Sequence, residues 1–231
     1  MENQTRDQKF AHLFELCEKL KKQVIYGRNI DEVIGDLQTT IDNPQASTTS
    51  RWRIAEDGLI HFSLTSTGET GAQWADWFTV NKFAVGSEFG SRYILRSASF
   101  KPSQVGTVYK IAVLPGNLFE KKRDWTSISN VRAEADRQGL KHGEEMNAEI
   151  ACLLRREFAN KELEAMGLFW VVCLHEPIAD GHGFLSLLGP GCYSGGRWFS
   201  AFRCGPDDVF PTKYHFATLV SVISPPMVEQ T

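Results

Sequence analysis

The sequence predicts an α+β protein in which helices pack on a mixed, mainly antiparallel sheet. Three observations lead to this class. Apolar residues recur at helical spacing in residues 1–42, and residues 51–65 and 197–223 show the patterns of antiparallel strands. Helical patterns lie between these strand regions without regular β–α–β alternation, which favours α+β over a doubly wound sheet. A chain of 231 residues, 42% of them hydrophobic, is long enough to enclose a substantial core.

Two amphipathic helices are expected first, as a helical hairpin over residues 1–42. Their apolar residues repeat every three or four positions: Phe10, Leu13, Phe14, Cys17, Leu20 and Val24, then Ile30, Val33, Ile34, Leu37 and Ile41. Residues 43–50 are polar and contain Pro, Ser and Thr, which indicates a linker. Residues 51–231 then form the α+β core domain.

The core domain is expected to begin with a β-hairpin over residues 51–65, with Ile60, Phe62 and Leu64 facing inward. Helices are predicted behind a capping box at Thr70, over residues 87–96, over 130–138 behind an Asn130 cap, and from about residue 144 to 158. Strands are predicted over residues 105–114, 197–202 and 214–223. Residues 168–175 are apolar on both faces, which predicts a central strand covered on two sides.

Composition excludes several classes of protein. The longest apolar run, residues 168–174, is far shorter than the ~20 residues of a membrane-spanning helix, and no secretory signal is recognisable. Five cysteines without a C-x-x-C pair fit reduced thiols, so a cytoplasmic protein is expected. The net charge is −3, and the one dense basic tract, residues 121–123, is flanked by acids. A nucleic-acid partner is therefore not expected.

One loop combines residue types that can carry chemistry. His175, Glu176, Asp180 and His182 follow the predicted central strand within HEPIADGHG. His175, Asp180 and His182 are the ligand types of a divalent metal such as zinc, and Glu176 would be the general base of a metal-dependent hydrolase. The loop is not the helical H-E-x-x-H motif, because Pro177 separates the histidines. Alternatively, His175 bonds a backbone carbonyl and the other three side chains are hydrated.

The other hypothesis is a soluble binding protein without a cofactor. Its contact surface would be the N-terminal amphipathic helices, which could pair with a partner protein or a second copy, or the aromatic C-terminal strands. Arg197 and Trp198 are the candidate binding residues on those strands, because Trp and Arg are common interface anchors.

Three segments resemble a group of uncharacterised bacterial proteins: YKIAVLPG at 109–116, NAEIACLLR at 147–155 and MGLFWVVCLHEPI at 166–178. The resemblance covers roughly residues 65–220 and implies no activity, fold or cofactor. The group carries a more acidic stretch after H-E-P-I, where this chain has ADGH. A metal site in the group would therefore not transfer directly to this loop.

Overall fold

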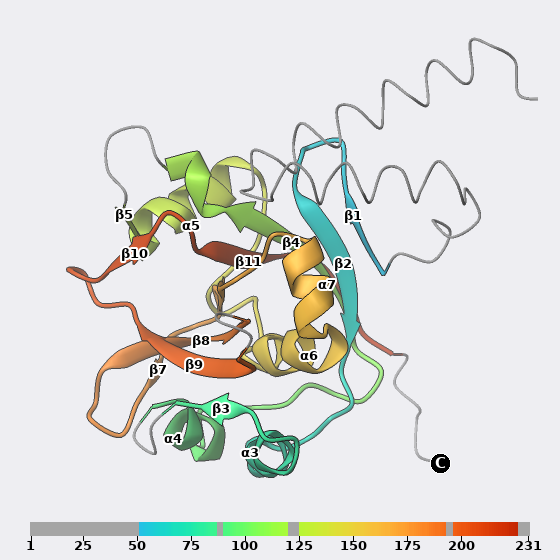
Figure 1. Ribbon diagram of the computed structural model, residues 1–231, viewed down its shortest axis with the longest axis vertical. Coiled ribbons are helices and arrows are strands. Elements are labelled where there is room, and N and C mark those ends of the chain that lie inside the picture. Colours follow the sequence, from blue (N-terminus) through green and yellow to red (C-terminus); the bar gives the residue numbers. More distant parts are fainter. Residues whose placement is uncertain (1–50, 87–89, 120–124, 193–195, 226–231) are drawn as a thin grey trace, which may run out of the picture.

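The computed structural model describes residues 51–86, 90–119, 125–192 and 196–225 (Figure 1). These residues form an α+β fold with a five-stranded sheet, β1-β2-β4-β11-β6, a four-stranded sheet, β3-β9-β8-β7, and a two-stranded ribbon of β10 and β5. The strand pairs are antiparallel except β11–β6 and β3–β9, which are parallel. The predicted class is confirmed. The predicted helical hairpin and linker lie outside the described residues.

The first sheet begins with the predicted β-hairpin. Its strands are β1 (Trp52–Ile54), β2 (Ile60–Thr65), β4 (Val108–Pro115), β11 (His215–Ile223) and β6 (Val171–Cys173). The hairpin turn is closed by Asp57, whose Oδ1 accepts the Leu59 N–H at 2.8 Å, and by Gly58 at a φ of 81°. Alternate residues of β2, from Ile60 to Leu64, are buried as predicted, because period-2 alternation places them on one face.

The second sheet contains the Gly-rich C-terminal region. Its strands are β3 (Ala84–Val85), β9 (Trp198–Arg203), β8 (Leu185–Gly191) and β7 (Ile178–Ala179). β8 and β9 form an antiparallel pair, and Gly189 and Gly191 belong to β8. At Gly189 a Cβ atom would lie 1.9 Å from the carbonyl oxygen of Val171, so glycine allows β8 to cross closely over β6.

Helices pack against both sheets. They are α3 (Gly71–Val80), α4 (Ser91–Arg96), the 3-10 turn η1 (Gly116–Phe119), α5 (Ile128–Arg137), α6 (Glu149–Glu157) and α7 (Asn160–Ala165). The ribbon consists of β5 (Trp125–Ser127) and β10 (Val209–Pro211). In Figure 1, α6 lies between the two sheets, and it contacts both β2 and β8.

The capping residues of the helices agree only partly with prediction. The capping box between Thr70 and Gln73 starts α3 as expected. The cap of α5 is Ser127 rather than Asn130, because the Ser127 hydroxyl accepts the Asn130 N–H. α6 begins at Glu149, five residues later than expected. A turn in which the N–H of Met146 donates to the carbonyl of Gly143 precedes it.

The prediction of a central strand at residues 168–175 is wrong in its position. Only Val171–Cys173 forms a strand, and β6 is the last strand of the first sheet, hydrogen-bonded there to β11 alone. Burial is nevertheless complete, since the residues of β6 are at most 1% exposed. β8 packs against β6, and Trp170 forms an isolated bridge to Gly191. A junction between two sheets therefore produces the same apolar run as the middle of one sheet.

One hydrophobic core runs through both sheets and the helices between them. Its largest fully buried side chains include Trp74, Phe78, Tyr109, Phe158 and Phe199. Within the described parts of the chain, no helix has the length and apolar character needed to cross a membrane.

Candidate functional site

His175 is held in the junction between the sheets, directly after β6. It is 1% exposed, its Nδ1 donates to the carbonyl oxygen of Glu176 at 2.7 Å, and its Nε2 accepts the backbone N–H of Leu188 at 2.8 Å. Burial lowers the pKa of His175 to about 4, because the charged imidazolium would lose its hydration. The side chain is therefore a neutral imidazole that ties β6 to β8. Neither ring nitrogen retains a free lone pair for a metal ion in this arrangement.

The other residues of the predicted metal loop do not converge with His175 on a metal site. Asp180 is 8% exposed, and its Oδ1 accepts the backbone N–H groups of His182 and Phe184 at 2.8 and 3.0 Å. This carboxylate closes the turn between β7 and β8, while Glu176 and His182 are exposed. Across the described residues, no three His, Cys, Asp or Glu side chains are grouped so that they could hold a metal ion.

Arg197 and Trp198 are adjacent in the sequence but make different contacts. The Arg197 guanidinium lies 4.0 Å from the centre of the Phe83 ring, and its Nη1 donates to the carbonyl oxygen of Asn81 at 3.1 Å. The Trp198 ring lies beside Trp170 with 6.4 Å between ring centroids, and the residue is 37% exposed. The two predicted binding residues therefore do not form one anchor.

Most of the aromatic residues of the C-terminal strands pack against one another. The rings of Trp170, Phe202, Phe210 and Tyr214 are 5.7–6.4 Å apart, in tilted and edge-to-face arrangements. This cluster joins the second sheet to the β5–β10 ribbon. Partial burial raises the pKa of the Tyr214 hydroxyl. The rings thus serve mainly as packing, which reduces the aromatic surface left for a partner.

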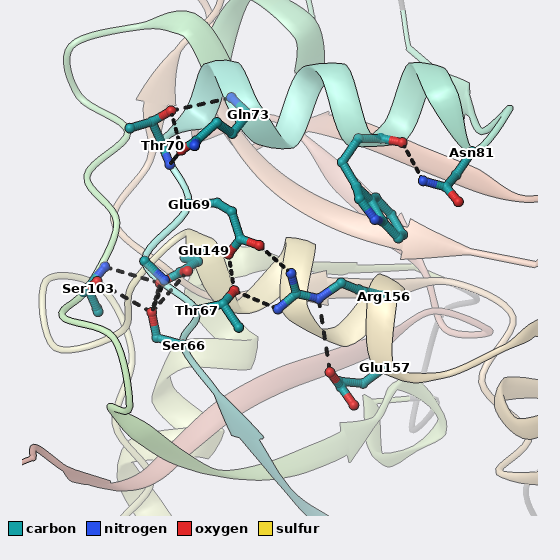
Figure 2. A network of polar contacts seen from close by, with 12 residues as sticks. Ser66, Thr67, Glu69, Thr70, Gln73, Asn81, Ser103, Glu149, Arg156 and Glu157 are labelled. Carbon is teal, nitrogen blue, oxygen red and sulfur yellow. Dashed lines mark hydrogen bonds and ion pairs between the residues drawn. The ribbon is translucent and has the colours of Figure 1, made fainter.

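A buried polar cluster that sequence reasoning missed surrounds the first residue of α6 (Figure 2). Glu149 is completely buried, and its carboxylate accepts the hydroxyl of Ser66 at 2.9 Å and the backbone N–H of Ser103 at 3.1 Å. Asn147 extends the cluster by accepting the Glu149 N–H and donating to the Ser103 hydroxyl. We call Ser66, Ser103, Asn147 and Glu149 the Glu149 network. Burial raises the pKa of Glu149, an effect that its hydrogen bonds partly oppose.

An ion pair closes the outer side of the Glu149 network. Arg156 on α6 contacts Glu69 at 2.6 Å and donates to the hydroxyl of Thr67 at 2.7 Å, and its guanidinium lies 4.4 Å from the Trp74 ring centre (Figure 2). Ser66 and Ser103 lie 83 and 46 residues from Glu149 along the chain, so no local sequence motif predicts the network. Its donors and acceptors are used internally, which makes it a structural connection between α6 and two loops.

A second polar cluster is open to solvent on the first sheet. A hollow of about 360 Å³ is lined by residues of β1, β2, β4 and β11 and by Arg51, which immediately precedes β1. Four basic side chains and one hydroxyl surround it: Arg51, Arg53, His61, Lys110 and Ser63. We call these five residues the cationic hollow. No carboxylate belongs to its described lining.

The strand register produces this concentration of basic residues. Arg53 on β1 is directly opposite His61 on β2, and Ser63 on β2 is directly opposite Lys110 on β4. Directly opposed residues share a face, so these side chains lie on the face that is turned away from the buried residues of β2. The alternation that turns Ile60, Phe62 and Leu64 inward also predicts that His61 and Ser63 face outward. It gave no indication that Lys110 would join them, because strand order is not a local property.

Carboxylates neutralise only part of the cationic hollow. Arg51 contacts Glu157 and Glu162 at 3.3 and 2.5 Å, and His61 contacts Asp57 at 2.8 Å. Lys110 donates to the Ser63 hydroxyl at 2.9 Å, a neutral partner.

Neither Arg53 nor Lys110 has an ion-pair partner among the described residues, and both are exposed. These two cations are free to pair with an anionic ligand.

Comparison of the chain with protein-family models, curated proteins and solved structures finds no match. The resemblance to a group of uncharacterised bacterial proteins therefore stays a prediction.

Proposed function

We propose that the protein is a binding protein that holds a short acidic segment of a partner protein in the cationic hollow. The observation that supports this function is the hollow of about 360 Å³ with basic side chains and no carboxylate in its described lining. Arg53 and Lys110 supply the unneutralised charge. Carboxylates of an extended segment can bridge them, and the Ser63 hydroxyl offers a further hydrogen bond.

The surroundings of the hollow favour an acidic peptide over a nucleic acid. Asp57, Glu157 and Glu162 pair with its basic residues, so a long polyanion would meet three carboxylates next to the two unneutralised cations. Nucleic-acid binding depends on many phosphates being neutralised along a continuous basic surface. A segment with two to four carboxylates fits this smaller charged area.

The expected affinity is modest. Solvent-exposed ion pairs contribute about 0.2–1 kcal/mol each, and they weaken as salt screens them. We expect a dissociation constant on the order of 100 µM, or about −5.5 kcal/mol, for an acidic peptide at low ionic strength. The two ion pairs contribute about 0.4–2 kcal/mol of this, and contacts with the rest of the lining contribute the remainder. Such affinity suits a reversible interaction. The bonded ring nitrogens of His175 give no support to the alternative of a metal-dependent hydrolase.

Fluorescence anisotropy with a fluorescein-labelled decaglutamate peptide tests this function on the full chain. Substituting Arg53→Ala and Lys110→Ala together is expected to weaken binding, by at most about tenfold, since two ion pairs are lost. A matched control, Lys101→Ala with Lys213→Ala, removes the same charge from exposed positions outside the hollow and is expected to keep the affinity.

Two results would contradict the proposal. One is equal binding by the Arg53→Ala/Lys110→Ala variant and the wild type. The other is equally tight binding of a ten-nucleotide single-stranded DNA, which would indicate general attraction of polyanions instead of recognition of an acidic segment.

A further inference from the structure

The part of the chain that leads toward β1 contains a strongly acidic segment. Residues 29–42 carry Asp31, Glu32, Asp36 and Asp42 and no Lys or Arg. If the segment has the helical periodicity that its sequence predicts, these acids fall on the side opposite to the apolar stripe of Ile30 to Ile41. Its composition therefore matches the ligand that the cationic hollow is proposed to take.

Chain connectivity keeps this segment near the hollow. Arg51, the first described residue, is itself part of the hollow. Only residues 43–50 separate it from the acidic segment, and eight residues can span at most about 26–29 Å when fully extended. A segment on so short a tether has an effective concentration of about 1 mM at a site within its reach.

We propose that residues 29–42 occupy the cationic hollow of their own chain and compete there with the acidic partner. This inference rests on the proposed function. The carboxylates of the segment pair with Arg53 and Lys110. The segment is thus an internal pseudo-ligand that sets the apparent affinity for the partner.

The size of the competition follows from the tether. If the segment alone binds the hollow with a dissociation constant of about 100 µM, an effective concentration of about 1 mM weakens partner binding about tenfold. Removing the competition should therefore tighten decaglutamate binding about tenfold, to a dissociation constant on the order of 10 µM.

Zero-length carbodiimide cross-linking of the full chain tests contact directly, because it joins a lysine amine to a carboxylate in an ion pair. Mass spectrometry is expected to find Lys110 joined to an acid of residues 29–42, and high salt should abolish the link. The Lys141–Glu145 pair, with 2.6 Å between charged atoms, is an internal positive control for the chemistry. Lys110→Arg keeps the charge and should lose the link.

A mixture of isotopically light and heavy protein identifies the chain that supplies the segment. Links within single chains support the proposal. Mixed light–heavy links at Lys110 would overturn it, because the occupant would then be a second copy. Absence of any link from Lys110 to residues 29–42, while the Lys141–Glu145 link forms, would overturn it as well.

Charge-neutral variants separate this inference from the proposed function. Asp31→Asn, Glu32→Gln, Asp36→Asn and Asp42→Asn together should tighten decaglutamate binding about tenfold. The matched control, Glu2→Gln, Asp7→Asn, Glu15→Gln and Glu18→Gln, removes the same charge from residues 1–26 and should leave affinity unchanged. Equal binding by all three proteins overturns the inference and leaves the proposed function standing. If none binds decaglutamate, the proposed function itself fails.

Discussion

The Glu149 network and the cationic hollow are built from similar polar side chains but differ in burial and in the use of their hydrogen bonds. Glu149 is completely buried and accepts hydrogen bonds from Ser66 and Ser103, which lie on separate loops. Arg53 and Lys110 are exposed, and neither has a carboxylate partner among the described residues. The hydrogen bonds of the Glu149 network stabilise the fold, whereas the cationic hollow leaves two positive charges available to a ligand.

This difference separates stability from binding in a way that substitutions can test. A buried polar group left without a partner costs the full free energy of its desolvation, whereas an exposed one is rehydrated at little cost. Substitutions in the Glu149 network should therefore change the free energy of unfolding, and those in the cationic hollow should change affinity.

The largest effect is expected for Glu149→Ala. The substitution leaves the Ser66 hydroxyl and the Ser103 N–H without their buried acceptor, so the free energy of unfolding should fall by about 3 kcal/mol. Urea denaturation followed by circular dichroism measures the change. Glu69→Gln, on the more exposed side of the cluster, is the control and should cost less than about 1 kcal/mol. Equal costs for the two variants would show that the network is not the structural connection described.

Acid pH tests a second pair of buried polar groups, His175 and His215. Burial lowers the pKa of each to about 4, whereas an unfolded histidine has a pKa of about 6.5. The unfolded chain therefore binds protons that the folded chain does not, and stability falls as pH falls from 6.5 toward 4.

Each buried histidine should contribute a slope of up to about 1.4 kcal/mol per pH unit. His215→Leu is the informative variant, because the Nδ1 of His215 is buried without a hydrogen-bond partner. Urea denaturation between pH 5 and 6.5 should show a shallower slope than in the wild type. If the free energy of unfolding depends on pH with the same slope in the variant and the wild type, the lowered pKa of His215 is refuted.

A smaller effect is expected for the ion pair that closes the Glu149 network. In a double-mutant cycle with Arg156→Ala and Glu69→Ala, the coupling free energy should be about 1 kcal/mol, because both side chains are only partly exposed. Arg156→Ala alone should cost more than the coupling, since it also removes the contact with the Trp74 ring. A coupling near zero would place this pair with ordinary surface salt bridges.

The smallest effect on stability is expected in the cationic hollow. Arg53→Ala with Lys110→Ala should change the free energy of unfolding by less than about 0.5 kcal/mol while weakening peptide binding, which is the reverse of the Glu149 result. Urea denaturation of the Arg53→Ala/Lys110→Ala variant measures the change in the free energy of unfolding. A stability loss comparable to that of Glu149→Ala would remove the distinction between the two clusters.

Sequence periodicity predicted the elements whose burial is decided locally. The inward residues of β2 and the capping box of α3 follow from alternation and spacing within a few residues. The position of β6 in the sheet could not be predicted in this way. An apolar run indicates that both faces of a strand are buried, but it does not indicate which strands lie next to it. The start of α6 was also misplaced, since Asn147 and Glu149 interact with loops distant in the sequence.

The sites were harder to predict than the elements, for the same reason. The loop from His175 to His182 contains suitable metal ligands by type, but the junction of two sheets uses His175 for backbone hydrogen bonds. The cationic hollow depends on β1, β2 and β4 lying side by side in one register, which brings Arg53 and Lys110 together across 57 residues of sequence. Pattern within a segment carries no information about such pairings.

The close crossing at Gly189 limits how this protein can vary. Even a methyl group at that position would overlap the main chain of the neighbouring strand, since its carbon would lie 1.9 Å from the carbonyl oxygen of Val171. Substitution there cannot be relieved by a different rotamer, because the obstacle is backbone. Homologues that share this architecture should keep glycine at this position. Otherwise, their two sheets should lie further apart, and the gap should either remain as a cavity or be filled by a larger side chain.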